Sequence, residues 1–304
     1  MELADRWKYG SRYAVSVQAD SKDGTASIWL AESAMPPLVF ALLSGAAALA
    51  PISVYDNVFS SADLHALDNE GTTGLRCYAR GQEATLLETA LDSVLAELGD
   101  DAPFVEYWAR DVWKHLEAHA DVDEALAKET GELRWPRHGH VLYLDVGCEV
   151  RGPTCVFAED ALVSVPAVAG RVLRFDGHLV HAVPEPFDVW FRSFSKRSPA
   201  SKERRRSVVL FNTWTEPPLG VPLNDAADAD GAPAMAQPRE AWTEATIREV
   251  IDADDRVAGK LPRLGDPTRR CGLPRFRSFE APAGLLDALR EERSVCHTRL
   301  REPG

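Results

Sequence analysis

The stretch Gly170-Arg-Val-Leu-Arg-Phe-Asp-Gly-His-Leu-Val-His-Ala-Val183 holds two short apolar runs around a turn at Asp176-Gly177. Short runs of Val, Leu and Phe that are bounded by Gly and Asp predict β-strands. The same pattern of short apolar runs bounded by turn residues recurs from about residue 104 onward, at Val105–Leu116, His140–Asp145, Thr154–Phe157, Leu162–Val165 and Ser207–Trp214. Because no helical pattern alternates with these runs, they predict a sandwich or jelly roll and not a parallel α/β sheet.

The residues before this β-rich region, 1–103, predict a support region of helices and strands. Alternating runs on both sides of Ser21-Lys-Asp-Gly24 predict a hairpin, and Ile52–Tyr55 is typical of a short strand. Ser60–Asp63 has the composition of a helix start. Apolar residues at helical spacing in Glu83–Leu98 predict an amphipathic helix that ends at Gly99.

The residues after the β-rich region, 218–304, predict an extension that packs back on the core. Leu219–Gln237 is rich in Ala, Asp, Gly and Pro, which is typical of a linker, and Trp242–Asp255 and Pro282–Arg293 predict helices. We therefore expect a mainly β protein with flanking helices. Its regions 1–103, 104–217 (the β core) and 218–304 are expected to form one structural unit.

Composition excludes several classes of protein. A net charge of −13, from 47 acidic and 34 basic side chains, argues against general binding of nucleic acid. The most apolar stretch, Leu38–Ala50, is shorter than the ~20 residues of a membrane span, so we expect a buried helix and no membrane contact. Five cysteines without a CxxC pair predict reduced thiols, and so a cytoplasmic or other reducing intracellular compartment.

Three separate stretches carry residues suited to a metal site. His119-Ala-Asp121 would point both side chains to the same face of a strand, and His181 lies near the end of the stretch Gly170–Val183. Two imidazoles and one carboxylate are the protein ligands of non-haem Fe(II) oxygenases, which leave coordination positions open. Arg205-Arg206-Ser207 opens a later apolar run, and an arginine there could hold a second carboxylate in two parallel hydrogen bonds.

Other interpretations of the histidines stay open. His178 competes with His181, but in an extended strand it would face the opposite way. His138-Gly-His140 could join His178 or His181 in a multi-histidine, cupin-type site for Fe, Mn or Zn that uses no cosubstrate. That site would leave His119, Asp121 and the arginine without a role. A non-catalytic β-sandwich binding protein is the second alternative.

Five stretches together resemble the Fe(II)/2-oxoglutarate-dependent dioxygenases, in particular their prolyl-hydroxylase-like branch. They cover roughly a third of the chain and are His119-Ala-Asp-Val-Asp-Glu, His140-Val-Leu-Tyr-Leu-Asp, Arg151-Gly-Pro-Thr-Cys-Val-Phe, Gly170 to His181, and Arg206-Ser-Val-Val-Leu-Phe-Asn-Thr-Trp214. The resemblance implies a cupin-like double-stranded β-helix. It also implies that His119, Asp121 and His181 bind Fe(II).

The same resemblance implies a hydroxylase. An arginine would pair with the C5 carboxylate of 2-oxoglutarate, with Tyr143 and Thr154 lining that pocket, and ascorbate could be a further cofactor. The reaction would release succinate and CO2. Related halogenases replace the carboxylate ligand by a small residue, so Asp121 favours hydroxylation or a related oxidation.

Two arginines compete for the cosubstrate. Arg205-x-Ser207 matches the arginine-x-serine pattern of the family literally, whereas counting back from Asn212 and Trp214 favours Arg206. Both cannot face inward on one strand. The basic segment 185–204 lengthens the gap after His181; we interpret it as a surface loop, with a lid as the alternative. The sequence leaves open which small-molecule or peptide substrate is used, and the oligomeric state.

Overall fold

The computed structural model describes residues 14–19, 26–31, 52–70, 74–147, 153–158, 161–183, 205–224, 236–240, 242–245, 247–249 and 295–299. The chain divides into two compact units, Met1–Ala48 and Leu49–Gly304. In the first unit, β1 (Ala14–Ala19) and β2 (Ala26–Ala31) pair antiparallel, as expected for the hairpin. The expected apolar helix at 38–50 and the basic segment 185–204 lie outside the described residues.

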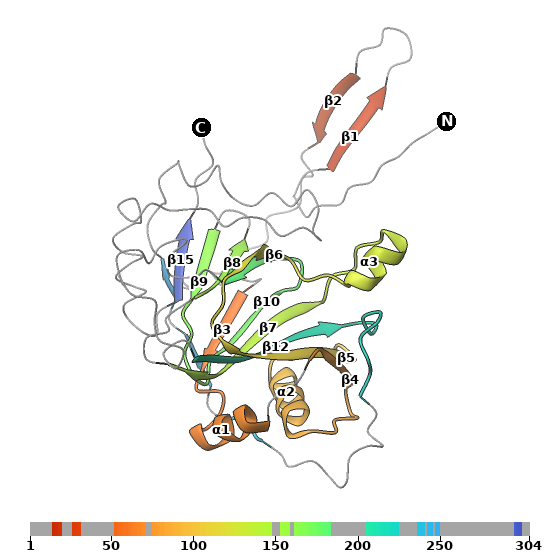
Figure 1. Ribbon diagram of the computed structural model, residues 1–304. Coiled ribbons are helices and arrows are strands. Elements are labelled where there is room, and N and C mark those ends of the chain that lie inside the picture. Colours follow the sequence, from red (N-terminus) through yellow and green to blue (C-terminus); the bar gives the residue numbers. More distant parts are fainter. Residues whose placement is uncertain are drawn as a thin grey trace. The chain divides into compact units, whose positions relative to one another are not determined.

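The second unit is built on two sheets (Figure 1), and their hydrogen-bonded strands are antiparallel except for the pair β14 and β15. The seven-stranded sheet has the order β13 (Thr243–Glu244), β3 (Ile52–Asp56), β10 (Val172–Asp176), β7 (His138–Val146), β12 (Arg205–Trp214), β5 (Phe104–Val112) and β4 (Arg76–Ala79). The six-stranded sheet has the order β14 (Ile247–Glu249), β15 (Val295–Arg299), β9 (Ala161–Val165), β8 (Thr154–Ala158), β11 (Val180–Val183) and β6 (Leu116–His119). The expected mainly β architecture is thus confirmed.

The two faces of the seven-stranded sheet bury different clusters. Along β7, Leu142 and Leu144 pack under the helices, whereas Val141 and Tyr143 pack toward the six-stranded sheet, because side chains alternate along a strand. The inner cluster also takes members such as Val156 from β8, so the sheets pack face to face as in a β-sandwich. This inner face is where β6 and β11 bring the candidate metal ligands.

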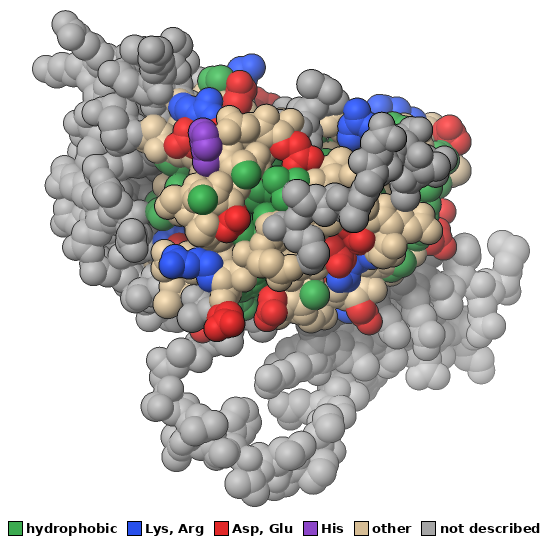
Figure 2. All heavy atoms as spheres, turned by 90° about the horizontal axis from the view of Figure 1, so that it is seen from below, with side chains coloured by type: hydrophobic (Ala, Val, Ile, Leu, Met, Phe, Trp, Pro, Cys, Tyr) green, Lys and Arg blue, Asp and Glu red, His purple; other side chains and the backbone are tan. Residues whose placement is uncertain are grey.

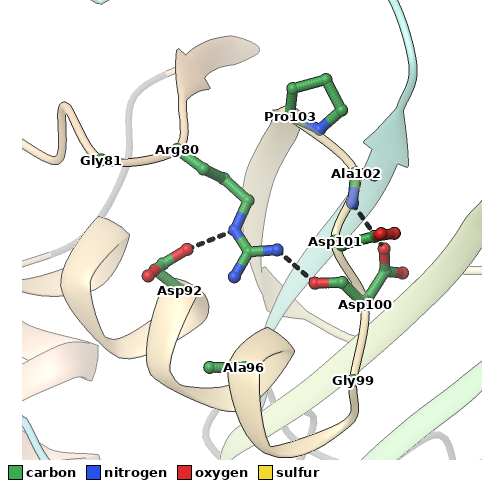
Figure 3. Close-up of a pocket in the computed structure, with 9 residues that line it drawn as sticks. All are labelled: Arg80, Gly81, Asp92, Ala96, Gly99, Asp100, Asp101, Ala102 and Pro103. Carbon is green, nitrogen blue, oxygen red and sulfur yellow. Dashed lines mark hydrogen bonds and ion pairs between the residues drawn. The ribbon is translucent and has the colours of Figure 1, made fainter.

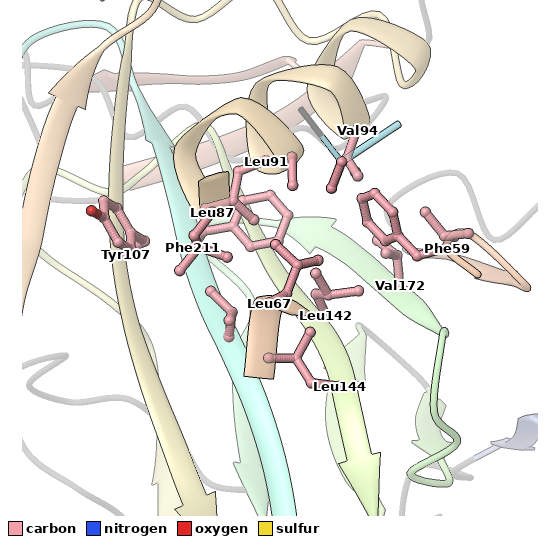
Figure 4. Close-up of a cluster of buried hydrophobic side chains, with 14 of the residues drawn as sticks. Phe59, Leu67, Leu87, Leu91, Val94, Tyr107, Leu142, Leu144, Val172 and Phe211 are labelled. Atoms are coloured by element: carbon pink, nitrogen blue, oxygen red, sulfur yellow. The ribbon is translucent and has the colours of Figure 1, made fainter. Parts of the chain in front are cut away.

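The helices α1 (Ser61–Glu70) and α2 (Leu86–Glu97) cover the outer face of the seven-stranded sheet. In Figure 4, Leu87, Leu91 and Val94 of α2 point onto this face. Thr85 caps α2 by accepting a hydrogen bond from the backbone N–H of Glu88, 3.1 Å away. Fully burying a leucine contributes about 1.5–3 kcal/mol, so this layer stabilises the sheet from outside.

Gly177, in the turn that joins β10 to β11, permits a close backbone approach. A Cβ built there would lie 2.0 Å from the carbonyl oxygen of Pro136, so only glycine fits. The turn returns the chain to the second sheet, where His181 pairs with the end of β6. The stretch Gly170–Val183 therefore connects the seven-stranded sheet to the six-stranded sheet.

Three expectations differ from the structure. The strand expected at 105–116 is divided into β5 and β6, with residues 113–115 between them. Asp121 lies beyond the end of β6 and not on the strand with His119. The helix expected at 242–255 is wrong where the structure describes it, because β13 and β14 pair there with β3 and β15 and so satisfy exposed strand edges.

The regions 1–103 and 218–304 both contribute strands to the two sheets of the core. β3 and β4 from the first region, and β13 to β15 from the last, extend the same two sheets as the core strands. Among the described residues, no helix is long and apolar enough to cross a membrane. Figure 2 shows acidic and basic side chains interspersed over the described surface of one face.

Candidate metal centre

His119, Asp121 and His181 come together at one end of the six-stranded sheet. His181 of β11 lies directly opposite His119, the last residue of β6, so the two imidazoles share a face and their ring centroids are 4.3 Å apart. The chain then places Asp121 beside both rings. Potential ligand atoms of the three residues all lie within 4.8 Å of one another.

The ring orientations suit metal binding through Nε2. His119 Nε2 lies 3.6 Å from Asp121 Oδ1, and His181 Nε2 lies 3.8 Å from Asp121 Oδ2. The opposite ring nitrogens face backbone carbonyls, with His119 Nδ1 2.8 Å from Glu117 O and His181 Nδ1 3.3 Å from Leu179 O. An Nδ1–H that donates to a carbonyl fixes the tautomer in which Nε2 carries the lone pair that binds a metal. The donor set fits Fe(II).

Asp121 is oriented by residues of the other sheet. Asn212 Nδ2 of β12 donates to Asp121 Oδ2 at 3.2 Å and lies 3.4 Å from Glu106 Oε2. Trp214 Nε1 donates to that same Glu106 oxygen at 3.1 Å. Burial, and then the charge of Asp121, raise the pKa of Glu106 to about 7, although the amide and indole hydrogen bonds act in the opposite direction.

Sequence reasoning missed Glu106 and the role of Asn212. Their contact depends on the pairing of β5 with β12, in which Glu106 lies opposite Asn212 although 106 residues separate them in the chain. A single charged residue between Val105 and Tyr107 in an otherwise apolar run was the available signal. This pattern predicts that Glu106 lies on a different strand face from its neighbours, but it does not predict that Asn212 lies opposite Glu106 on the next strand.

Arg206 is buried on the inner side of β12. Its Nη2 donates to Thr154 Oγ1 at 2.8 Å, and the Tyr143 hydroxyl lies 2.7 Å from the same Thr154 oxygen. The guanidinium carbon lies 5.1 Å from the Tyr143 ring centroid. Arg206 Nε has no hydrogen-bond partner, and no acidic side chain among the described residues pairs with the group. Burial lowers the pKa of this guanidinium.

Arg205 points elsewhere. Its guanidinium forms ion pairs with Asp68 of α1 and Asp145 of β7, and its side chain is 43% exposed. The structure thus groups Arg206 with Tyr143 and Thr154, and it leaves Arg205 on the outer surface of the sheet.

The Arg206 group and the three candidate ligands share the inner face of the six-stranded sheet. His181 lies opposite Val156 of β8, and Thr154 lies two residues earlier on that strand, so both face the same way. Two residues of a strand span roughly 7 Å. The buried guanidinium therefore lies about one such step along β8 from the imidazoles.

The other histidines do not join the centre. His140 is buried on the outer face, where its ring stacks on Phe211 at 4.5 Å, and burial lowers its pKa to about 3. His138 Nδ1 lies 2.6 Å from Asp100 Oδ2, and His178 is exposed in the turn before β11. The alternative multi-histidine site is therefore not formed, because His138 and His140 face away from His181.

A separate cavity of about 540 Å³ lies beside the end of α2 (Figure 3). Its charges are matched within the protein: Arg80 binds Asp92 and the carbonyl oxygen of Asp100. Although burial acts in the opposite direction, the hydrogen bond from His138 lowers the pKa of Asp100. On the inner face of the sheets, by contrast, the buried Arg206 guanidinium has no acidic partner within the described part of the chain.

No protein-family model matches this chain, and no curated protein matches it. Among solved structures, a prolyl-4-hydroxylase from Pseudomonas putida is 18% identical over 55% of this chain and 89% of its own, with a TM-score of 0.36. HygX from Streptomyces hygroscopicus with iron bound is 17% identical over 62% and 92%, with a TM-score of 0.34. The viral collagen prolyl hydroxylase vCPH from Paramecium Bursaria Chlorella virus-1 is 11% identical over 60% and 100%, with a TM-score of 0.33. These TM-scores are below 0.5, so neither the fold nor the chemistry of this chain rests on them.

Proposed function

We propose that this protein is a non-haem Fe(II)- and 2-oxoglutarate-dependent dioxygenase that hydroxylates a C–H bond of an amino acid, peptide or small metabolite. The convergence of His119, Asp121 and His181 is the observation that carries the proposal. Two imidazoles and one carboxylate on one side of an ion leave positions for a bidentate cosubstrate and oxygen. Bound iron supplies the activation of oxygen, with release of succinate and CO2.

The strand connections support a double-stranded β-helix for the core of this enzyme. Of the eight consecutive strands from β5 to β12, four alternate into each sheet, and only β8 and β9 follow each other within one sheet. In this arrangement β6 and β11 are neighbours at one edge of the six-stranded sheet. We infer that this arrangement fixes the ligand geometry.

Arg206 is proposed to bind the C5 carboxylate of 2-oxoglutarate. A buried guanidinium without an acidic partner is unfavourable, and a carboxylate ligand would satisfy the unpaired Nε and neutralise the charge. Thr154 would hold the guanidinium in place through the hydrogen bond to Nη2, with Tyr143 supporting Thr154. Thr154 and the residue opposite His181 are about 7 Å apart along β8. This distance suits 2-oxoglutarate, whose C5 carboxylate would bind Arg206 while its 2-oxo acid end binds the metal.

Anaerobic spectroscopy tests the proposal. Fe(II) and 2-oxoglutarate together should give a weak visible charge-transfer band, which should be absent with either component alone. His181→Ala should lose the band because it removes a ligand, whereas His178→Ala should keep it because His178 is exposed in a turn. No band in the wild type, or a band of equal intensity in His181→Ala, would contradict the proposed centre.

A further inference from the structure

Glu106 lies on the face of β5 that looks toward the six-stranded sheet. Its chain neighbours Val105 and Tyr107 belong to the outer cluster under α2, and side chains alternate along a strand. Trp108 follows on the inner face, opposite Leu210, and is partly exposed. The inner face of β5 near the metal centre thus presents a carboxyl group and then an indole.

One side chain separates Glu106 from the candidate ligands. Asn212 Nδ2 lies within 3.4 Å of Glu106 Oε2 and 3.2 Å of Asp121 Oδ2. Both protein hydrogen bonds to Glu106 reach Oε2, and Oε1 accepts none from the residues that the structure describes. The carboxyl group therefore keeps one oxygen available beside the metal centre.

The charge of Glu106 has no counterpart in the described part of the chain. The side chain is buried, at 8% exposed, and no lysine, arginine or histidine forms an ion pair with it. Two other buried carboxylates differ in this respect: Asp123 binds Arg134, and Asp100 binds His138. A buried carboxylate without a cation is unfavourable, and a cation that arrives with a ligand would relieve this.

We propose that Glu106 and Asn212 form the substrate subsite and that it takes a cationic nitrogen, an ammonium or a guanidinium group. The inference rests on the proposed function, because it assigns the substrate class of that same centre. The cation binds Glu106 Oε1 and brings the neighbouring C–H bond to the metal, and the face of Trp108 offers a second attraction for it. An acidic substrate would meet both Glu106 and Asp121, and a neutral one would leave Glu106 unpaired.

The overall charge supports this substrate class. The chain carries 47 acidic and 34 basic residues, and such a field attracts cations to the protein and raises their rate of association. Among these cations, the subsite would select those whose cationic nitrogen and reacting C–H bond are separated by the distance from Glu106 to the metal.

The test uses the Fe(II)-loaded, full-length protein and measures succinate release with 2-oxoglutarate in air. Amino acids, polyamines and amino sugars are added one by one, each paired with its fully N-acetylated form. At least one amine should stimulate succinate release, and its N-acetylated form should stimulate at least tenfold less. This comparison needs no variant. If neutral or acidic compounds stimulate best, or if no amine does while the anaerobic Fe(II)/2-oxoglutarate band is present, the proposal is wrong and the proposed function still stands.

Glu106→Gln then separates recognition from support of Asp121. It should raise the half-saturating concentration of the stimulating amine at least tenfold, with a smaller effect on the maximal rate, and should keep the anaerobic band. Asp111→Asn, an exposed carboxylate on the same strand, is the matched control and should leave the amine dependence unchanged. Loss of the band in Glu106→Gln would overturn the proposal, since Glu106 would then act only by holding Asn212 against Asp121.

Discussion

Arg171, which directly precedes β10, and Arg206, the second residue of β12, are both buried, but their surroundings differ. Arg171 donates through Nε and Nη2 to both oxygens of Asp56, at 2.8 and 3.0 Å, and through Nη1 to the carbonyl oxygen of Pro166 at 2.9 Å. Arg206 donates to Thr154 Oγ1 at 2.8 Å and lies against Tyr143, and its Nε has no hydrogen-bond partner among the described residues. The first arrangement is complete without a ligand, which is typical of a structural ion pair. In the second arrangement no acidic side chain of the described residues meets the guanidinium fork, which is what the proposed carboxylate site requires.

Removing the satisfied arginine should give the largest loss of stability. Arg171→Ala leaves Asp56 without its bidentate partner, and breaking a buried pair from one side costs about 3–5 kcal/mol. Urea unfolding measures this change. In whatever fraction stays folded, the affinity for 2-oxoglutarate should be unchanged, and a loss of affinity would blur the distinction between the two arginines.

Arg206→Ala should show the opposite pattern. The loss of the guanidinium should weaken 2-oxoglutarate binding by about 2–5 kcal/mol, because a buried charge pair loses one partner. The free energy of unfolding without ligand should change by only about 1 kcal/mol, since the lost contacts with Thr154 and Tyr143 are offset by removal of a buried charge that has no acidic partner among the described residues. Titration of the anaerobic band with 2-oxoglutarate measures the first quantity and urea unfolding the second. Equal losses in both would make Arg206 a structural residue like Arg171.

Glu106 extends the comparison to a buried carboxyl group that has no cationic partner among the described residues. Its pKa in the folded, metal-free protein is raised to about 7 from 4.5, so the folded state binds the proton more tightly than the unfolded chain. The free energy of unfolding should therefore fall as pH rises from about 4.5 to 7, by roughly 3 kcal/mol if this group acts alone. Glu106→Gln should remove this fall, so that the variant is more stable than the wild type at pH 8 and no more stable at pH 4. Parallel pH curves for the two proteins would show that Glu106 has a solvent-like pKa.

Arg205→Ala should have the smallest effect. Its side chain is 43% exposed, so solvent screens its pairs with the exposed Asp145 and the largely buried Asp68, and pairs of an exposed cation contribute about 0–1 kcal/mol. Stability by urea unfolding should change by no more than that, and the 2-oxoglutarate titration should match the wild type. If Arg205→Ala weakens 2-oxoglutarate binding while Arg206→Ala does not, the register of β12 is wrong by one residue.

Local sequence patterns predicted much of the β core. The apolar runs around residues 140–145, 154–157, 162–165, 171–175 and 207–214 each form a strand, because β-branched and aromatic residues bounded by turn residues fit a half-buried pleated surface. The order and spacing of His119, Asp121 and His181 predicted three residues that the structure brings together. Few residue types bind Fe(II), so two histidines and an aspartate in this order leave few other candidate ligands in the chain.

Other features depended on pairing between distant strands. Arg205 and Arg206 were distinguishable only through the strand face that each occupies, and a β-bulge in β12 near Ser207 disturbs simple alternation. The contact of Glu106 with Asn212 likewise follows from the register of β5 and β12. The helix predicted at 242–255 failed because tertiary pairing with β3 and β15 overrode local helical periodicity.

The central claim is that His119, Asp121 and His181 form an Fe(II) centre that oxidises 2-oxoglutarate. Its most direct test is the amount of succinate and CO2 formed from 2-oxoglutarate in air by the Fe(II)-loaded wild type and by Asp121→Ala. We expect equal amounts of succinate and CO2 from the wild type and none above background from the variant. Wild-type protein that forms no succinate, or Asp121→Ala that forms it at the wild-type rate, would contradict the claim.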